Sequence, residues 1–255
     1  MKKIKKLVVG NWKMNPRTMA EALKIFTEIK KDTVKMKNTD VVMCPPAIFL
    51  PELSKKLSKN SALGAQTVSQ GKEGAFTGEI STGMLDSLNV KYIIVGHSER
   101  REMGETDFMI SKKVESALNA KLYVVLCVGE KERDEECTYL EALKSQIENS
   151  LQTVPKNLLS KLVIAYEPVW AIGEKATGKI DPAGLLEIVI FIRKILSGIY
   201  DQETAHSMKI LYGGSVDETN AEDFMKEGGI GGLLVGRASL NPKKFIQIVK
   251  IAENL

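Results

Sequence analysis

The sequence predicts an α/β fold, specifically a closed (β/α)8 barrel. Short runs rich in β-branched residues alternate with longer helical patterns along the 255 residues, and eight of each can be counted. Most of the short runs are apolar throughout, which is typical of parallel strands that are covered on both faces. Eight strand and helix units in a chain of this length favour a closed barrel, and a doubly wound open sheet is the alternative.

The expected strands follow one another at regular intervals. They are Lys6 to Gly10, Asp40 to Cys44, Ser61 to Ala65, Tyr92 to Gly96, Tyr123 to Val128, Leu162 to Tyr166, Lys209 to Tyr212 and Gly232 to Val235. The segments between them repeat apolar residues at helical steps, as in Ala22, Phe26 and Ile29. Two helix starts carry capping signals, Thr106-Asp107 and Asp181-Pro182. No linker rich in Pro, Gly or Ser interrupts the pattern, so we expect a single barrel domain over residues 1–255.

The composition excludes several classes of protein. The formal net charge of +4 suits a small anionic substrate but is too weak and too dispersed to indicate nucleic-acid binding. The basic segment Met1 to Lys6 is followed by an apolar run far too short for a signal peptide, and no stretch is long enough to span a membrane. Three cysteines without paired spacing indicate reduced, mostly buried thiols and a cytoplasmic protein. A catalytic thiol at Cys127 is the alternative interpretation.

The segment from Ile164 to Lys179 is the functional centre of the predicted fold. An apolar run ends at Tyr166 and is followed by Glu167 and Pro168. Because proline cannot donate a ladder hydrogen bond, the chain leaves the sheet there and a carboxylate stands at the end of the strand. The next residues, Val169 to Ile172, are apolar and lead into small residues, a composition typical of a mobile lid. The alternative is an ordinary strand end with a solvated glutamate.

Polar and glycine residues follow other expected strands. They are Asn11, Trp12 and Lys13 after the first strand, His97, Ser98 and Glu99 after the fourth, Gly213, Gly214 and Ser215 after the seventh, and Gly236 to Ser239 after the eighth. Parallel strands end on one side of a barrel, so these groups should share a face with Glu167. Individually, Lys13 could be a surface charge, His97 a core histidine and Gly213-Gly214 a tight turn. Their common position after strands favours a single site with free backbone N–H groups for an anion.

This set of side chains supports proton transfer next to a carbonyl group. Glu167 can act as the base, and His97, Asn11 and Lys13 can donate hydrogen bonds to the enediolate that forms. A retaining glycosidase that uses Glu99 and Glu167 is a competing interpretation. That chemistry requires two carboxyl groups about 5 Å apart and no phosphate site, so the glycine-rich turns count against it.

The motifs at the strand ends resemble those of the triosephosphate isomerase family. They are GNWKMN (Gly10 to Asn15), CPPAIFL (Cys44 to Leu50), GAFTGEIS (Gly74 to Ser81), GHSERR (Gly96 to Arg101), AYEPVWAIG (Ala165 to Gly173), YGGSV (Tyr212 to Val216) and LLVGRASL (Leu233 to Leu240). They occur in the family's order over essentially the whole chain. The resemblance implies a TIM barrel that interconverts dihydroxyacetone phosphate and D-glyceraldehyde 3-phosphate through an enediolate, in glycolysis and gluconeogenesis, with no cofactor and no metal.

The resemblance also implies roles for individual residues. Glu167 matches the family's base, His97 the neutral imidazole that polarises the carbonyl, and Lys13 the ammonium near the substrate. Asn11 matches an amide beside that ammonium, and Glu99 matches the carboxylate behind it. The residues that match the phosphate site through their backbone N–H groups are Gly173, Ser215, Gly236 and Arg237. The loop Gly74 to Glu79 resembles the one that a second subunit receives, with Thr77 reaching that subunit's Asn11 and Lys13, which implies a homodimer.

Three positions depart from the family pattern. Arg237 replaces a common glycine, and this residue keeps open an isomerase that acts on a phosphorylated four-carbon ketose. Gly231 replaces an aspartate that usually pairs with the arginine matching Arg193, so Arg193 needs another partner. The lid exit, Glu174 to Asp181, is longer than usual. A sugar-phosphate-binding protein without turnover is a further alternative, which the combination of Glu167 and His97 argues against.

Overall fold

The computed structural model describes residues 5–58, 61–173 and 176–255, and its central feature is a closed barrel of parallel strands. The strands are β1 (Lys6–Asn11), β2 (Thr39–Cys44), β3 (Ser61–Ala65), β4 (Val90–Val95), β5 (Tyr123–Val128), β6 (Leu162–Tyr166), β7 (Lys209–Tyr212) and β8 (Gly232–Val235). They are hydrogen-bonded in chain order, and β1 closes the barrel against β8 through pairs such as Val9 with Leu234. The predicted (β/α)8 barrel is therefore confirmed, and the open sheet is excluded.

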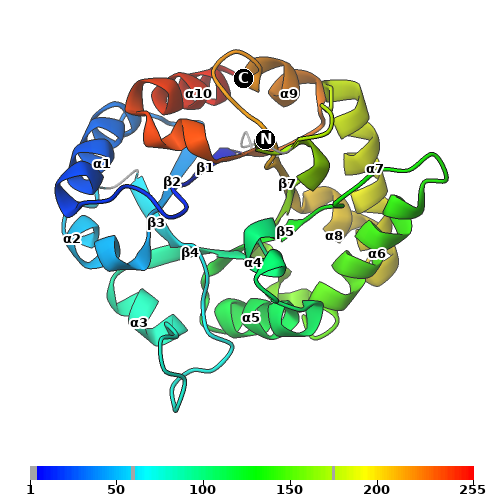
Figure 1. The fold of residues 1–255 in the computed structure, drawn as a ribbon, viewed down its shortest axis with the longest axis horizontal. Coiled ribbons are helices and arrows are strands. Elements are labelled where there is room, and N and C mark those ends of the chain that lie inside the picture. The colour runs from blue at the N-terminus through cyan, green and yellow to red at the C-terminus, as the bar shows by residue number, and fades with distance from the viewer. Residues whose placement is uncertain (1–4, 59–60, 174–175) are drawn as a thin grey trace.

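Helices surround the barrel on its outside (Figure 1). The α-helices are α1 (Met19–Thr33), α2 (Leu50–Ser54), α3 (Thr82–Ser87), α4 (Ser98–Glu102), α5 (Asp107–Asn119), α6 (Thr138–Leu151), α7 (Pro182–Ile199), α8 (Gln202–Ser207), α9 (Ala221–Glu227) and α10 (Pro242–Asn254). Short 3-10 helices are η1 (Ala47–Phe49), η2 (Lys156–Lys161), η3 (Val169–Ala171) and η4 (Arg237–Leu240). The expected count of one helix per strand was wrong at two places, because β4 is followed by both α4 and α5, and β6 by both α7 and α8.

Local sequence signals explain where the elements begin and end. Thr106 and Asp181 accept backbone hydrogen bonds as the N-caps of α5 and α7, as their sequences predict. Gly96 was predicted as the last residue of a strand, but β4 ends one residue earlier. Gly96 has a φ of +73°, a left-handed conformation that takes the chain out of the sheet and into α4.

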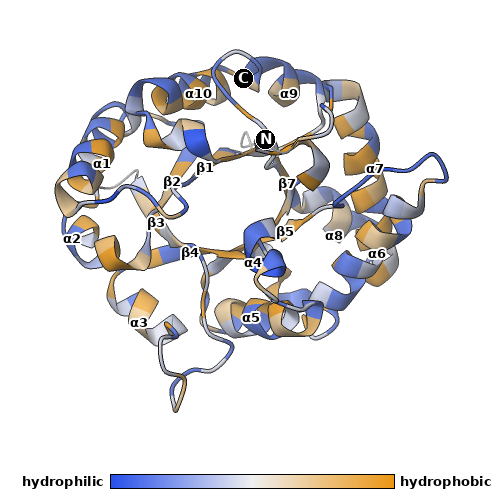
Figure 2. Ribbon diagram, in the orientation of Figure 1, coloured by the Kyte–Doolittle hydropathy of each residue, from blue (hydrophilic) through white to orange (hydrophobic). Residues whose placement is uncertain are grey.

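The core has two layers because side chains alternate along each strand. Leu7 and Val9 point into the barrel, where they join residues such as Val125 and Leu211. Val8, between them, packs outward against the helices. In Figure 2 the strands are coloured mainly as hydrophobic, whereas α4 is strongly hydrophilic. The helix α4 therefore stands out as a polar element at the rim of an apolar barrel.

The structure also bears on the expected free, mostly buried thiols and on the expected absence of a membrane span. Cys44 and Cys127 are buried, Cys137 is exposed, and all three are free thiols. Within the described ranges, no helix has the length and apolar character needed to cross a membrane.

Candidate active site

The C-terminal ends of the strands bring the predicted residues to one face of the barrel. Asn11 ends β1, His97 precedes α4, and Glu167 follows β6. The turn after β7 contributes Ser215, and the turn after β8 contributes Gly236. Because the strands are parallel and closed into a barrel, residues far apart in the sequence meet around one opening.

Glu167 is the most deeply buried acidic residue of this face, with 2% of its surface exposed. Its Oε2 accepts a hydrogen bond from the backbone N–H of Ser98 at 3.1 Å, and its Oε1 lies 3.3 Å from Nε2 of His97. Its own N–H donates to the carbonyl of Val128 at 2.8 Å, which extends the β5–β6 pairing by one residue. The carboxylate is thus held by the barrel and withdrawn from water, which excludes the solvated strand end.

Two glycines make room for Glu167. A Cβ on Gly129 would lie 1.8 Å from the carbonyl oxygen of Glu167, and a Cβ on Gly213 would lie 2.9 Å from its Cγ. Both are far inside normal contact distance, so only glycine fits at Gly129 without moving Glu167. Sequence analysis did not identify Gly129, because its importance comes from a contact with a residue on the next strand.

His97 is oriented by the first turn of α4. The residue is the N-cap of this helix, and its Nδ1 accepts the backbone N–H of Glu99 at 3.2 Å. A ring nitrogen that accepts an N–H carries no proton, so the proton of the neutral imidazole is on Nε2. Nε2 lies 3.3 Å from Oε1 of Glu167, and only 8% of His97 is exposed. His97 is therefore a buried imidazole whose protonated nitrogen lies on the side of Glu167.

Lys13 lies next to this pair and has a strained backbone. Its φ is +53°, in the left-handed region that lysine rarely adopts. The conformation is held from both sides, since its N–H donates to Oδ1 of Asn11 at 3.0 Å and its carbonyl accepts from Nε2 of Gln66 at 2.8 Å. The ammonium pairs with Glu99 at 2.6 Å. Gln66 is a supporting residue that the sequence did not reveal.

The position of Glu99 bears on the glycosidase alternative. Its Oε2 lies 3.7 Å from Nδ1 of His97, while Glu167 lies on the Nε2 side of the same ring. Each carboxylate therefore contacts the imidazole, and Glu99 is also bound to Lys13. Two carboxylates that flank a glycosidic bond would have to face each other across open space, so this arrangement argues against a glycosidase.

The predicted phosphate-binding residues lie around the same opening. Ser215 donates from its hydroxyl to the carbonyl of Ala171 in the lid at 3.0 Å. A Cβ on Gly236 would lie 3.6 Å from Cε of Lys13, so this glycine is next to the ammonium. Gly173 has a φ of +78° and open space around it at the tip of the lid, and Arg237 is exposed at the start of η4. Ser215 is thus hydrogen-bonded to the lid and Gly236 lies next to Lys13, whereas a Cβ on Gly173 would meet nothing within 4 Å.

Comparison with known proteins identifies the family. The sequence profile described as triosephosphate isomerase matches residues 6–252. The chain belongs to the triosephosphate isomerase family. A relative named triosephosphate isomerase from Dictyoglomus turgidum is 43% identical over 249 residues, and the match covers 96% of this chain and 99% of that protein. Another, from Dictyoglomus thermophilum, is 44% identical over 253 residues, with 96% of this chain and 99% of that protein covered. That of Endomicrobium trichonymphae is 42% identical over 253 residues, with 98% and 99% covered.

The lid that follows Glu167 is anchored at its entry by a buried carboxylate. Oε1 of Glu130 accepts hydrogen bonds from Nε1 of Trp170 at 2.8 Å and from the hydroxyl of Tyr166 at 2.7 Å, and it pairs with Arg133 at 3.0 Å. The Arg133 guanidinium also stacks on the Trp170 ring, 4.8 Å from its centre. Burial and the nearby charge of Glu130 raise the pKa of Tyr166. This anchor was not predicted, because it joins the lid to the loop after β5.

The lid exit departs from the triosephosphate isomerase pattern, and its first two residues lie outside the described residues. From Ala176 onward it packs back on the entry. The N–H of Thr177 donates to the carbonyl of Trp170 at 2.8 Å, and a Cβ on Gly178 would lie 2.6 Å from the Trp170 ring. Trp170 is thus shared by the entry and the exit of the lid.

Because position 231 is a glycine and not an aspartate, Arg193 needs another partner, and backbone carbonyls supply it. Its Nη1 donates to the backbone carbonyls of Ala205, His206 and Met208 at the end of α8. These are carbonyls that a helix terminus leaves without partners, so the guanidinium caps α8. A carboxylate at position 231 is therefore not needed to satisfy Arg193.

Two remaining candidates concern thiol and metal chemistry. Burial, assisted by the nearby charge of Glu167, raises the pKa of the Cys127 thiol well above its ordinary value. Such a thiol stays protonated at neutral pH, which argues against Cys127 as a nucleophile.

Among residues 5–58, 61–173 and 176–255, no three His, Cys, Asp or Glu side chains are grouped as a metal site.

Proposed function

We propose that this chain interconverts dihydroxyacetone phosphate and D-glyceraldehyde 3-phosphate through an enediolate, without a cofactor. The observation that carries the proposal is the buried contact of 3.3 Å between Glu167 and Nε2 of His97, which joins a base and a proton donor. Binding a sugar phosphate needs only an anion site. A fixed base beside a fixed donor is what proton transfer between adjacent carbons requires.

In the proposed mechanism, the carboxylate of Glu167 removes a proton from one substrate carbon and returns it to the neighbouring carbon. The Nε2–H of His97 donates to the carbonyl oxygen as negative charge develops there, and Asn11 assists. Lys13 supplies positive charge for the enediolate and the phosphate, and Glu99 holds its ammonium in place through the 2.6 Å ion pair. One donor aimed at a developing oxyanion typically contributes about 10² to 10³ in rate.

The phosphate group is held by backbone N–H groups in our proposal, at Gly173 when the lid closes and at Ser215, Gly236 and Arg237. A closed lid excludes water from the enediolate and prevents the loss of phosphate by elimination. The tie between Ser215 and Ala171 supports a coupling of the phosphate turn to the lid.

A homodimer formed through the loop Gly74 to Glu79 is part of the proposal, with Thr77 directed to the partner subunit. This loop joins β3 and α3 and projects from the barrel in Figure 1. It exposes Phe76 (47%), and Met14 beside Lys13 is 92% exposed. Exposed apolar side chains at an active-site rim favour a protein interface. Sedimentation velocity tests it, since the chain should sediment as a dimer and a chain that lacks residues 75–78 as a monomer.

We further propose one domain for residues 1–255 and a cytoplasmic protein. The continuous strand order of one barrel supports the first, and three free thiols in a member of a glycolytic enzyme family support the second.

The direct test is turnover of D-glyceraldehyde 3-phosphate, followed by a coupled dehydrogenase that oxidises NADH as dihydroxyacetone phosphate appears. We expect turnover with this substrate and little with a phosphorylated four-carbon ketose. Preference for the four-carbon compound would assign the chain to the sister reaction, and tight binding of triose phosphate without turnover would reduce it to a binding protein.

A further inference from the structure

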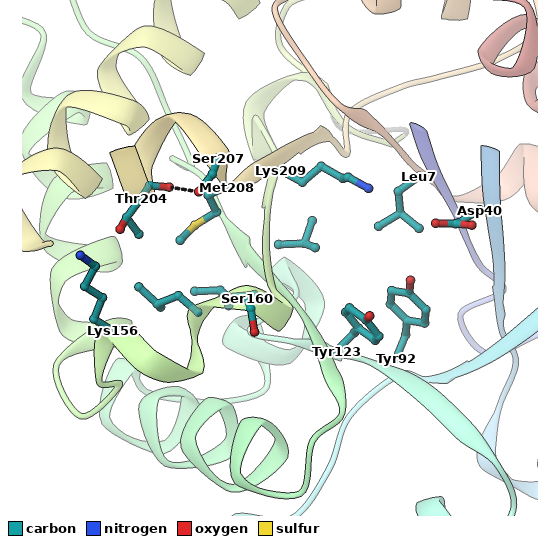
Figure 3. A pocket seen from close by; sticks show the side chains of 13 residues that line it. Leu7, Asp40, Tyr92, Tyr123, Lys156, Ser160, Thr204, Ser207, Met208 and Lys209 are labelled. Atoms are coloured by element: carbon teal, nitrogen blue, oxygen red, sulfur yellow. Dashed lines mark hydrogen bonds between the residues drawn. The ribbon is translucent and has the colours of Figure 1, made fainter. Parts of the chain in front are cut away.

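A second cavity lies at the opposite end of the barrel from the candidate active site. Its lining residues come from the first residues of the strands, from η2 and from α8 (Figure 3). They are Leu7, Asp40, Tyr92, Tyr123, Lys156, Leu159, Ser160, Leu162, Val163, Thr204, Ser207, Met208 and Lys209. Leu162 begins β6 and Glu167 follows its end, so the two sites are separated by about 16 Å at a rise of about 3.3 Å per residue. The cavity therefore takes no part in the chemistry proposed above.

The cavity has the size of a small-molecule site. Its volume of about 380 Å³ falls within the range of about 300 to 1,000 Å³ that is usual for ligand pockets. Leu162, Val163 and Met208 supply apolar wall. Figure 3 shows Lys156 at one end of the lining and Leu7, Asp40 and Tyr92 at the other, with Lys209 between them. An apolar wall with a few polar groups is typical of sites that bind small organic molecules.

The charges of the cavity leave one cation unmatched. Asp40 pairs with Lys5 at 3.2 Å, and Lys156 pairs with Asp201 at 2.6 Å. Lys209 has no ion pair and no hydrogen bond to any part of the chain that the structure describes. Burial lowers the pKa of Lys209, although Asp40 acts in the opposite direction. An ammonium that is partly withdrawn from water without a partner destabilises a fold, so a ligand that supplies a negative charge would relieve it.

Gly231 makes this placement of Lys209 possible. A Cβ at position 231 would lie 2.6 Å from Cγ of Lys209 and 3.5 Å from its Cδ. The aliphatic stem of the lysine therefore lies against the bare backbone of Gly231, and Figure 3 shows the ammonium directed toward Leu7 and Asp40. A larger residue at 231 would displace the stem and move the charge.

Two tyrosines add further donors. The rings of Tyr92 and Tyr123 are stacked with their centres 4.8 Å apart, and Lys161 lies 5.0 Å from the centre of the Tyr123 ring. The ring of Tyr123 thus has close neighbours, whereas neither hydroxyl has a hydrogen bond to the described residues. Phenolic O–H groups are good donors to anionic oxygens. The ammonium and both hydroxyls belong to the lining of one cavity.

We propose that this cavity binds a small amphiphilic anion. A carboxylate, sulfonate or phosphate group is bound by the ammonium of Lys209 and the hydroxyls of Tyr92 and Tyr123. The apolar body of the ligand packs against Leu162 and Met208. The assignment rests on the cavity, its unmatched cation and its unpartnered hydroxyls, and it is independent of the isomerase proposal.

The test uses two fluorescent probes with the same apolar body, 8-anilinonaphthalene-1-sulfonate and the neutral N-phenyl-1-naphthylamine. Titration of the folded protein should give one sulfonate site per chain. Lys209→Met should weaken binding of the sulfonate by about tenfold or more, the loss of one charge-assisted hydrogen bond, and should leave the neutral probe unchanged. Lys144→Met, a lysine of α6 that contacts no residue of the lining, is the matched control and should have no effect.

A second variant keeps the test informative if Lys209→Met fails to fold. Ser160 is exposed at the rim of the cavity, and its hydroxyl has no hydrogen bond within the described residues. Ser160→Trp should therefore block the cavity and abolish binding of both probes. Isomerase turnover should be unchanged. Equal sulfonate affinity in wild type and Lys209→Met, or unaltered binding to Ser160→Trp, would each overturn the proposal.

Discussion

Replacing Gly129 by alanine should displace the proposed base, and the structure sets the size of the effect. The new Cβ would lie 1.8 Å from the carbonyl oxygen of Glu167, about 1.5 Å short of the roughly 3.3 Å of a close carbon–oxygen contact. The obstacle is backbone, so the end of β6 must move with its carboxylate. Because a misplacement of about 1 Å can reduce a rate about 10²-fold, we expect kcat to fall by about that factor. Overpacking of this kind should also destabilise the fold by about 1–3 kcal/mol.

Two other glycines provide the controls for this experiment. At Gly213 the new Cβ would lie 2.9 Å from Cγ of Glu167, a side-chain atom that can shift, so Gly213→Ala should reduce kcat less than Gly129→Ala. At Gly198, within α7, a Cβ would meet nothing within 4 Å, so Gly198→Ala should leave kcat unchanged and stabilise the protein by about 0.5–1 kcal/mol. The coupled assay and thermal unfolding measure all three. Wild-type kcat in a folded Gly129→Ala protein would refute the reasoning.

Three further outcomes can be measured. Burial acts to raise the pKa of Glu105, but its bonds to Lys113 and Arg100 outweigh this and hold that pKa below its ordinary 4.5. The stability that this carboxylate contributes is present above pH 4.5 and is lost as pH falls through the lower folded pKa. Glu105→Gln should therefore cost about 3–5 kcal/mol of unfolding free energy at pH 7, because it leaves the buried ammonium of Lys113 without its carboxylate. The difference from wild type should shrink in denaturant titrations as pH falls below 4.5, and a constant difference would contradict the assignment. Thr177→Val keeps the backbone bond to Trp170 but removes the 3.3 Å hydroxyl bond, so it should increase release of inorganic phosphate during turnover, and unchanged release would show that this bond does not hold the lid. Arg237→Gly should leave KM within about threefold, under about 0.7 kcal/mol, if only the main-chain donor binds phosphate; a larger rise would implicate the side chain.

The fold was predictable where a single local signal decides the structure. The run Leu162 to Tyr166 is apolar throughout and ends at Glu167-Pro168, so β6 was predicted with its observed bounds. The error at Gly96 arose because glycine is compatible with both a strand and the left-handed turn that it adopts. The helices α4 and α8 were missed because five and six residues are too short for a helical period to appear.

The candidate site was predictable for the residues that follow strands, since strand position and chemical type are both visible in the sequence. The supporting residues were not. Gln66 acts on Lys13 across 53 positions, and Glu130 on Trp170 across 40. Such contacts are created by barrel closure, and neither residue lies in a pattern that distinguishes it from a surface polar residue. The contact between Lys209 and Gly231 likewise appears only when β7 and β8 lie side by side.

The central claim is that Glu167 moves a proton between two carbons of a triose phosphate. Its most direct test is the kinetics of Glu167→Asp, which shortens the side chain and withdraws the base by about 1 Å while keeping its charge. With D-glyceraldehyde 3-phosphate in the coupled assay, we predict that wild type turns over and that kcat of the variant falls about 10²-fold or more with KM nearly unchanged. An unaltered kcat in the folded variant would contradict the claim.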